Sequence, residues 1–252
     1  MRHLRVLGGC GGWPEAGRAA SGFLIEWDGF RIVLDLGYAT LPRLLTRCTA
    51  DQVDAVVITH GHADHCVDAH ALYRARANAD TKLPRIPLLC ADGVVGRLAA
   101  FDPRADLRKV FAVHDVYEQP WPQRAGPFSI NGFDLPHHVP NVGVRLATPE
   151  MTLAYTGDSG PDPALADLGA DADLFIVEAT MQGSPPADQP GRARYDLTAG
   201  EAGAWAARAG ARRLMLTHFW PGSDRAVSVA EAAAAFPGEI LTAEEDLVVA
   251  LG

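Results

Sequence analysis

Short apolar stretches bounded by glycine, proline and aspartate recur early in the chain, and each predicts a strand. They lie at 4–9, 22–27, 30–37 and 54–60. The last, DAVVITH, is a run of small and β-branched residues, as expected for a strand that is buried on both faces. The spacing of apolar residues then changes, and residues 63–77 (ADHCVDAHALYRARA) are predicted to form a helix.

The same order of strands and helices recurs further along the chain. Further strands are expected at 84–90, 132–136, 142–148, 151–158, 172–180, 212–218, 239–243 and 246–251. Further helices are expected at 93–101, 163–168, 198–210 and 228–236. Strands are followed by helices in each of two halves, roughly 1–135 and 136–252. This order predicts one α/β domain of stacked sheets that are covered outside by helices. A doubly wound parallel sheet is the alternative, and the short turns between the early strands weigh against it.

Composition narrows the class of protein. The chain has 252 residues, 48% of them hydrophobic, and a net charge of −9, which argues against binding nucleic acid through a broadly basic face. We find neither a signal-peptide apolar segment nor a run of 18 apolar residues, so we expect a cytoplasmic protein with no membrane contact. Four cysteines without a C-x-x-C pair indicate reduced thiols rather than disulfides.

Three histidines and an aspartate fall within six positions of ITHGHADHC, residues 58–66. Side chains two apart on an extended chain point the same way, so His60 and His62 are expected to converge beyond the strand end. Asp64 and His65 then lie in the first turn of the predicted helix, where the helix dipole favours a carboxylate. Imidazole and carboxylate together suit zinc or a related divalent metal; a solvated turn without a ligand is the alternative.

Four side chains of one short peptide cannot all bind a single ion without strain. Other histidines and aspartates follow apolar strands and precede turns, as the first cluster does: His137, His138, Asp158 and His218. A site assembled from several strand ends is what two ions about 3.5–4 Å apart require, with a shared hydroxide as the nucleophile.

The ordered set H-x-H-x-D-H, His, Asp, His resembles the metallo-β-lactamase superfamily, whose members are four-layer αββα sandwiches. The resemblance spans nearly the whole chain and implies two divalent metal ions, Zn²⁺ with Mn²⁺ or Fe²⁺ as alternatives. His60, His62 and His137 would bind the first ion, Asp64, His65 and His218 the second, and Asp158 would bridge them. Asp35 in VLDLG matches the superfamily's early aspartate, which orients ligands; a strand-end carboxylate satisfied by backbone amides is the alternative.

The third histidine lies in LPHHVPNVGVRL rather than in a P-G-H-T segment. This arrangement is similar to the branch that contains tRNase Z and small cyclic-phosphate phosphodiesterases. The spacing to Gly143 favours His137 over His138 as the ligand, and the common β-lactamase type has a cysteine where this chain has Asp158. The resemblance therefore implies a phosphodiesterase that acts on a small or cyclic phosphodiester through a metal-bridging hydroxide. Hydrolysis of an ester, lactone, thioester or amide, and a non-catalytic metal-binding scaffold, are the alternatives.

Two histidines of the tRNase Z pattern are replaced here, one by Val177 and one by Asp196. The second assists proton transfer to the leaving group in that family, so Asp196 is a catalytic candidate beside Asp64 and Asp158. The alternative for Asp196 is the N-cap of the helix at 198–210, for which Thr198 also qualifies. The chain lacks the long basic arm of tRNase Z, so we expect a small anionic substrate rather than nucleic acid. A homodimer is implied by the resemblance alone.

Aromatic and histidine side chains beside the motif segments are candidates for substrate contacts. Trp13, Tyr195 and Trp220 are expected in loops, where they could form a wall for a base or an acyl chain, and His138 is added to them. Covering of the core is the alternative for the aromatic residues.

Overall fold

The computed structural model describes residues 1–115, 121–185 and 193–252, and its strands form two seven-stranded mixed sheets. In the first sheet the order is β14-β1-β2-β3-β4-β5-β6. Its strands are β1 (Arg2–Gly8), β2 (Gly22–Trp27), β3 (Phe30–Leu34), β4 (Ala55–Ile58), β5 (Ile86–Cys90), β6 (Phe111–Asp115) and β14 (Val248–Ala250). β14, β1, β2 and β3 pair antiparallel, whereas β3 to β6 pair parallel.

The second sheet has the order β13-β12-β11-β10-β9-β8-β7. Its strands are β7 (Gln123–Ala125), β8 (Phe128–Leu135), β9 (Asn141–Ala147), β10 (Thr152–Tyr155), β11 (Leu174–Glu178), β12 (Arg213–Thr217) and β13 (Glu239–Thr242). β7 to β10 pair antiparallel and β10 to β13 pair parallel, so each sheet has an antiparallel and a parallel part. The sheets divide the chain between β6 and β7, and β14 returns to the first sheet.

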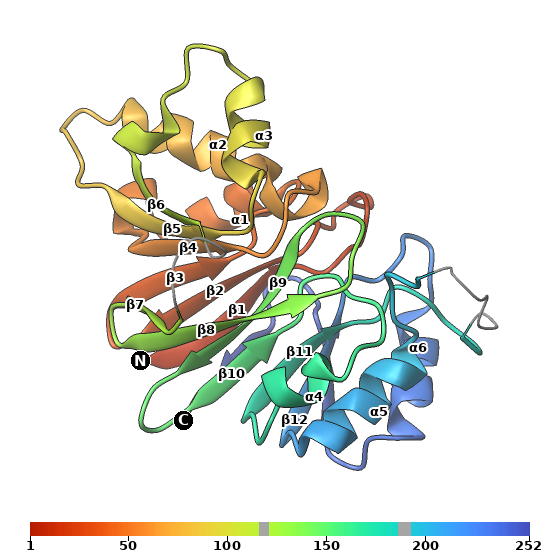
Figure 1. Ribbon diagram of the computed structural model, residues 1–252. Coiled ribbons are helices and arrows are strands. Elements are labelled where there is room, and N and C mark those ends of the chain that lie inside the picture. The colour runs from red at the N-terminus through yellow and green to blue at the C-terminus, as the bar shows by residue number, and fades with distance from the viewer. Residues whose placement is uncertain (116–120, 186–192) are drawn as a thin grey trace.

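Helices lie on the outer faces of the two sheets, which pack against each other (Figure 1). On the side of the first sheet are α1 (Thr40–Leu45), α2 (Ala63–Ala77) and α3 (Val94–Ala100), with two short 3-10 helices at Ala50–Gln52 and Leu107–Lys109. On the second sheet lie α4 (Ala164–Leu168), α5 (Ala199–Ala209) and α6 (Arg225–Ala233). The predicted αββα arrangement of stacked sheets covered by helices is confirmed.

Burial explains why these segments form these elements. All four residues of β4 are buried, as the unbroken apolar run predicts. α5 buries a face of small residues, Ala199, Ala202, Gly203, Ala206 and Ala209, of which Gly203 lies against Ala232 of α6. None of the described helices has both the length and the apolarity needed to cross a membrane.

Some elements differ from the sequence-based expectations. α1 and β7 had not been predicted, and α6 begins at Arg225 instead of residue 228 because Asp224 caps it, accepting a hydrogen bond from Ala226 N at 2.9 Å.

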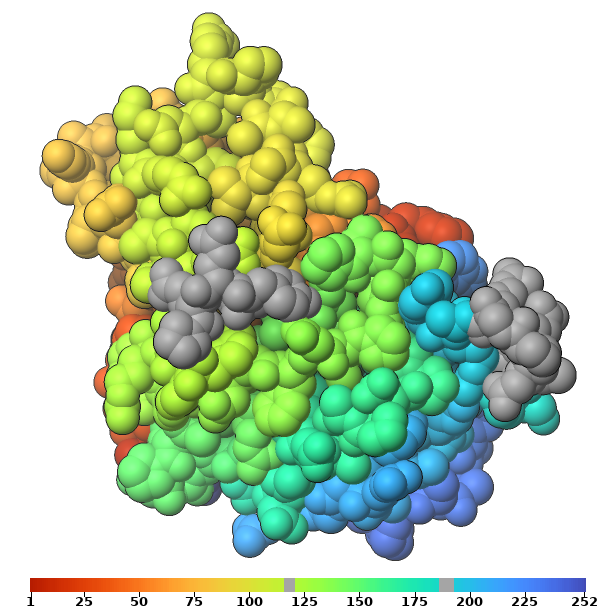
Figure 2. Space-filling view, viewed as in Figure 1, coloured from red at the N-terminus to blue at the C-terminus, as the bar shows by residue number. Residues whose placement is uncertain are grey.

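One part of the surface projects beyond the rest of the molecule in Figure 2. Its yellow to yellow-green colours correspond to residues of about 80–110.

The loops that carry the predicted ligands meet at one edge of the molecule. β3 and β4 run parallel in one sheet, and β10, β11 and β12 run parallel in the other, so within each sheet their carboxyl ends lie together. An isolated bridge between His60 and Asn141 joins the loop after β4 to the start of β9 in the opposite sheet. The fold therefore brings the loops of both sheets to a common centre.

Gly37, in the loop after β3, allows α2 to approach this centre. A Cβ at residue 37 would overlap the carbonyl oxygen of Asp64, in the first turn of α2. We expect Gly37→Ala to displace that turn and to lower metal affinity at least tenfold without removing a ligand. Metal titration of the purified variant measures this.

The control for this substitution is Gly96→Ala. Gly96 lies exposed in α3 and has no atom within 4 Å of the added Cβ. Its replacement should leave metal binding unchanged and raise the free energy of unfolding by about 0.5–1 kcal/mol. Equal metal affinity in the two variants would contradict the assignment of Gly37.

Candidate metal centre

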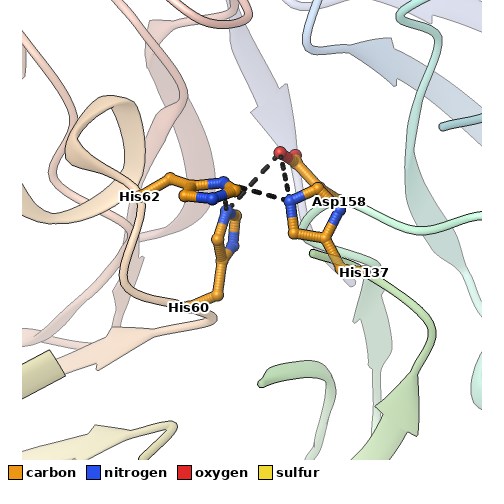
Figure 3. A group of neighbouring side chains, drawn as sticks. All are labelled: His60, His62, His137 and Asp158. Carbon is orange, nitrogen blue, oxygen red and sulfur yellow. Dashed lines mark hydrogen bonds and ion pairs between the residues drawn. The ribbon is translucent and has the colours of Figure 1, made fainter. Parts of the chain in front are cut away.

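Seven side chains from both sheets form two groups, each able to hold a metal ion. His60, His62, His137 and Asp158 make up the first group, and Figure 3 shows His60 and His62 from one loop converging with His137 and Asp158 from two others. Asp64, His65, Asp158 and His218 make up the second, and within each group the ligand atoms lie within 4.8 Å of one another. Asp158 belongs to both groups. The structure thus brings together all seven residues singled out as ligands in the sequence.

The histidines of the first group present different ring nitrogens. His62 Nδ1 lies 3.2 Å from His60 Nε2 and 3.0 Å from His137 Nε2. The other nitrogens of two rings are held by oxygens: His60 Nδ1 lies 3.1 Å from Thr59 Oγ1, and His137 Nδ1 lies 3.1 Å from Tyr195 O. Because the carbonyl of Tyr195 can only accept, His137 Nδ1 donates and its Nε2 is free for a metal.

The second group is arranged in the same way. His65 Nδ1 lies 2.7 Å from Asp35 Oδ2, and His218 Nδ1 lies 2.8 Å from Thr180 Oγ1. The Nε2 atom of each ring therefore faces the carboxylates, His65 at 3.1 Å from Asp158 Oδ1 and His218 at 3.2 Å from Asp64 Oδ2. His218 has a φ of 58°, an uncommon conformation for a residue with a side chain, which the contacts at this site maintain.

The donor set fits divalent metal ions. Ligands of a tetrahedral ion with bonds of about 2.0–2.1 Å lie about 3.3 Å apart, and the contacts within the two groups run from 3.0 Å to 3.6 Å. His65 Nε2 and Asp158 Oδ1 are buried and lack a hydrogen-bond partner, although they lie only 3.1 Å apart. A metal ion bound between these two buried atoms would satisfy both of them.

The first group is uncharged apart from Asp158 in the metal-free protein. Burial, together with the neighbouring His65, holds the pKa of His60 well below its ordinary value. Burial also lowers the pKa of His62 and of His137. These three imidazoles are therefore neutral at pH 7 and ready to bind a metal without losing a proton.

The second group is charged. Burial alone would lower the pKa of His65 and His218, but Asp158 and Asp64 raise both, that of His218 to about 9. Burial alone would likewise raise the pKa of Asp64 and Asp158, but the two histidines hold both below their ordinary values. The protons on His65 and His218 supply positive charge at the place where a metal ion would supply it.

Asp35 lies beneath the second group and accepts four hydrogen bonds. Thr59 N donates to its Oδ1 at 2.8 Å, and Thr59 Oγ1, Tyr155 Oη and His65 Nδ1 lie 2.9, 2.8 and 2.7 Å from its Oδ2. Asp35 is fully buried and has a φ of 54°. The carboxylate contacts His65 Nδ1 and so orients this ring, which agrees with the positioning role that the resemblance implied for Asp35.

We expect Asp35→Asn to lower metal affinity about 10–100-fold. Asparagine tolerates the positive φ, so the substitution tests the side chain rather than the backbone. Whichever way the amide is turned, its NH₂ group faces at least one donor, which costs about 1–3 kcal/mol. Metal titration of the variant gives the affinity.

Asp28→Asn is the matched control, because Asp28 has a φ of 50° and lies exposed beside Arg2. Metal affinity should be unaffected by it. An Asp35→Asn protein that binds metal as tightly as this control would refute the positioning role.

Glu178 is a buried carboxylate at the end of β11 that had not been singled out from the sequence, where only its neighbour Val177 was noted as a departure from the family pattern. It accepts hydrogen bonds from Ser159 N and Thr180 Oγ1, both at 2.5 Å, and from Leu197 N at 3.2 Å. Burial and the nearby negative charge of Asp158 raise its pKa to about 8. Because Thr180 donates to Glu178, its oxygen accepts from His218 Nδ1, which leaves His218 Nε2 for the metal. The available signal was a glutamate within the apolar run LFIVEAT.

The glycine-rich segment after β1 also contributes to the site. Gly12 N donates to Asp64 Oδ2 at 2.7 Å, and a Cβ at Gly11 would lie 2.7 Å from the ring of His218. From the sequence, this segment was considered only as a weak nucleotide-binding motif. It instead lies against two of the predicted ligands, where only backbone without side chains fits.

The prediction that Asp196 caps α5 is wrong, and its alternative, Thr198, is the N-cap. Thr198 Oγ1 accepts a hydrogen bond from Glu201 N at 3.2 Å, and the carboxylate of Glu201 accepts one from Thr198 N at 3.0 Å. The helix begins at Ala199, so Asp196 lies too far ahead to reach its first amides. Asp196 instead lines a pocket beside the metal centre.

The predicted substrate contacts lie around this centre. The rings of Trp13 and Trp220 meet edge to face, with centroids 4.9 Å apart, and each is about half exposed (49% and 46%). His138 is exposed and its ring contacts that of Tyr195, with centroids 4.4 Å apart. His138 is absent from both ligand groups, and its substrate contact stays a prediction, as do those of the three aromatic residues.

Comparisons with known proteins agree with this architecture. Residues 29–219 match the family model described as "Beta-lactamase superfamily domain". The chain is 30% identical to the probable metallo-hydrolase YhfI of Bacillus subtilis over 85% of this chain and 86% of that protein. The crystal structure of YhfI has a TM-score of 0.85, with 99% of both chains covered and 29% identity. Ribonuclease Z of Kineococcus radiotolerans is 30% identical over 93% of this chain and 89% of its own.

The family model covers most of the chain, and the two sheets bring a cluster of histidines and aspartates that is able to bind metal to the ends of their strands. This chain therefore belongs to the beta-lactamase superfamily and is a metal-dependent hydrolase of it.

Proposed function

We propose that the protein is a phosphodiesterase that uses two divalent metal ions to hydrolyse a small or cyclic phosphodiester. Among divalent metals, Zn²⁺ fits the ligands best. The observation that carries this proposal is the position of Asp158. Its carboxylate lies 3.5 Å from His60 and 3.6 Å from His137 on one side, and 3.1 Å from His65 and 3.3 Å from His218 on the other. One carboxylate shared by two ligand groups is the arrangement of a two-metal site.

Two bound ions would supply a hydroxide nucleophile at neutral pH and offset the charge that builds on the phosphoryl oxygens. The chain's own groups prepare the site for this. Asp35, Thr180 and the carbonyl of Tyr195 each hold a ligand histidine in one orientation, so little rearrangement is needed when substrate binds. Asp64 is held in place by Gly12 N at 2.7 Å.

The choice of a phosphodiester is supported by the relatives. One is named ribonuclease Z, and a fold neighbour at 19% identity, with a TM-score of 0.75, is a diphosphatase of the PhnP family. The net charge of −9 favours a small anionic substrate over nucleic acid. A cytoplasmic location and a homodimer remain predictions from the sequence.

The test is a hydrolysis screen of protein loaded with Zn²⁺ or Mn²⁺. We expect turnover of bis-p-nitrophenyl phosphate and of cyclic nucleotides, with two ions per chain measured by elemental analysis. A panel of p-nitrophenyl esters, lactones and thioesters is assayed in parallel. A higher kcat/KM on that panel, with no phosphodiester turned over, would overturn the proposal in favour of acyl hydrolysis. Two bound ions with no turnover in either panel would indicate a metal-binding scaffold.

A further inference from the structure

A pocket of about 510 Å³ opens beside the second ligand group, and its volume is within the usual range for small-molecule sites. Thr180, Gln182, Asp196, Trp220 and Ser223 are among its lining residues. Thr180 Oγ1 lies 2.8 Å from His218 Nδ1, so the wall of the pocket contacts a predicted metal ligand. A substrate whose phosphate is at the metals can therefore place an adjoining group in this pocket.

Asp196 lies between two neighbours whose backbone groups contact the metal centre or the residues that support it. The carbonyl of its neighbour Tyr195 accepts a hydrogen bond from His137, and its other neighbour, Leu197, donates from its backbone to Glu178 at 3.2 Å. Leu197 O also accepts from Met181 N at 3.0 Å, which joins this segment to the pocket wall after β11. The backbone of Asp196 is thus rigid, and its half-buried side chain lines the pocket.

Gln182 and Asp196 present acceptor oxygens to the pocket, which the hydroxyl-bearing residues Thr180, Ser184 and Ser223 also line. Gln182 Nε2 donates to Asp224 O at 2.6 Å and to Ser228 Oγ at 2.9 Å. Its two protons are thus used within the protein, and the amide oxygen is the atom that Gln182 offers to a molecule in the pocket. Asp196 offers a carboxylate. A ligand group that fits this pair carries N–H donors, and one with a carbonyl in the same place would meet opposed lone pairs.

The aromatic side of the pocket is Trp220. Its indole packs over Gly12, where an added Cβ would lie 3.3 Å from the ring, and edge to face against Trp13. The ring is held from these sides yet remains 46% exposed. A fixed and partly exposed indole is a surface on which a planar heterocycle stacks.

We propose that this pocket is a nucleobase subsite, and that Asp196 selects bases with an exocyclic amino group over bases with a carbonyl at the same position. The inference rests on the proposed phosphodiesterase function, and it narrows the substrate to a nucleotide diester of adenine or cytosine rather than of hypoxanthine or uracil. Asp196 is a specificity residue in this proposal, which replaces its suggested role in proton transfer.

Two isosteric pairs test the proposal: 3′,5′-cyclic CMP against cyclic UMP, and cyclic AMP against cyclic IMP. Within each pair the amino group is exchanged for a carbonyl oxygen, and the adjoining ring nitrogen (N3 of the pyrimidine, N1 of the purine) changes from an acceptor to an N–H donor. With metal-loaded protein we expect kcat/KM to favour the amino-bearing base at least tenfold in both pairs. Ratios within a factor of two in both pairs would overturn the inference.

Asp196→Leu should bring both ratios to within threefold of one. Asp167→Leu, a loss of the same charge from an exposed position on α4, should keep the ratios of the unmodified protein. A group that only transfers a proton would, when removed, lower kcat on all four nucleotides equally and leave the ratios unchanged. That result would overturn the role of Asp196 in selection.

A binding experiment separates failure of this inference from failure of the proposed function. Isothermal titration calorimetry with 5′-AMP, 5′-CMP and 5′-UMP requires no turnover and does not depend on tryptophan fluorescence. We expect tighter binding of AMP and CMP than of UMP, weakened at least tenfold by Trp220→Ala and much less by Trp220→Phe. If binding follows this order while no diester is hydrolysed, only the proposed function fails. Absence of AMP and CMP binding in protein that hydrolyses bis-p-nitrophenyl phosphate would sink the nucleobase subsite alone.

Discussion

Asp158→Asn is expected to lower kcat/KM at least 1,000-fold and to reduce bound metal from two ions per chain to one or none. Asp158 is buried at 2% exposure and is the only residue that belongs to both ligand groups of the described chain. Asparagine keeps the shape of the side chain but removes its charge and one of its two acceptor oxygens. His65 and His218 then lose one of the carboxylates that raise their pKa.

A 1,000-fold loss corresponds to about 4 kcal/mol of transition-state stabilisation, which is in the range for the loss of a metal ion. Elemental analysis gives the metal content, and kcat/KM is measured on the best diester of the screen. Asp167→Asn, on the exposed face of α4, is the matched control and should retain two ions and full activity. A variant at Asp158 that keeps both ions and more than a tenth of its activity would refute the bridging role.

The ligands could be predicted from the sequence because each lies where local rules apply. His60 and His62 follow an unbroken apolar strand, and His218 follows another, so the strand ends could be located from where these apolar runs stop. Asp64 lies in the first turn of α2, as its position after the strand predicts. The division of the ligands between two ions came from the resemblance, and the distances around Asp158 agree with it.

The supporting contacts could not be predicted because they join residues far apart in the sequence. Glu178 and Leu197 are 19 residues apart, and Gly12 and Asp64 are 52 apart. No periodicity links such pairs, because each depends on how two sheets and their loops pack. The same holds for β14, which returns from the end of the chain to pair with β1. The cap of α5 was left open between two residues for a local reason: Asp196 and Thr198 are both good caps, and only the capping box with Glu201 decides between them.

Removal of metal with a chelator is expected to abolish turnover and to lower the melting temperature by about 10 °C for each ion lost. An ion present at about 1,000 times its Kd adds about 4 kcal/mol to the free energy of unfolding. In a chain of this size each kcal/mol shifts the midpoint by about 2–4 °C. Differential scanning calorimetry and activity assays before and after dialysis against a chelator, followed by addition of Zn²⁺ or Mn²⁺, measure both effects. Full activity in protein that elemental analysis shows to be free of metal would contradict a metal-dependent reaction.

The same experiment at several pH values should separate the two ligand groups. In the metal-free protein the carboxylates Asp158 and Asp64 raise the pKa of His218 to about 9, so an ion in the second group must displace a proton at neutral pH. For every proton that this ion displaces, its affinity should therefore fall about tenfold for each pH unit below 9. The first group is different, because burial lowers the pKa of His60, His62 and His137 and leaves them neutral. Metal titrations from pH 8 to pH 6 should consequently show one ion released well before the other, and two ions lost with the same pH dependence would contradict this difference in charge.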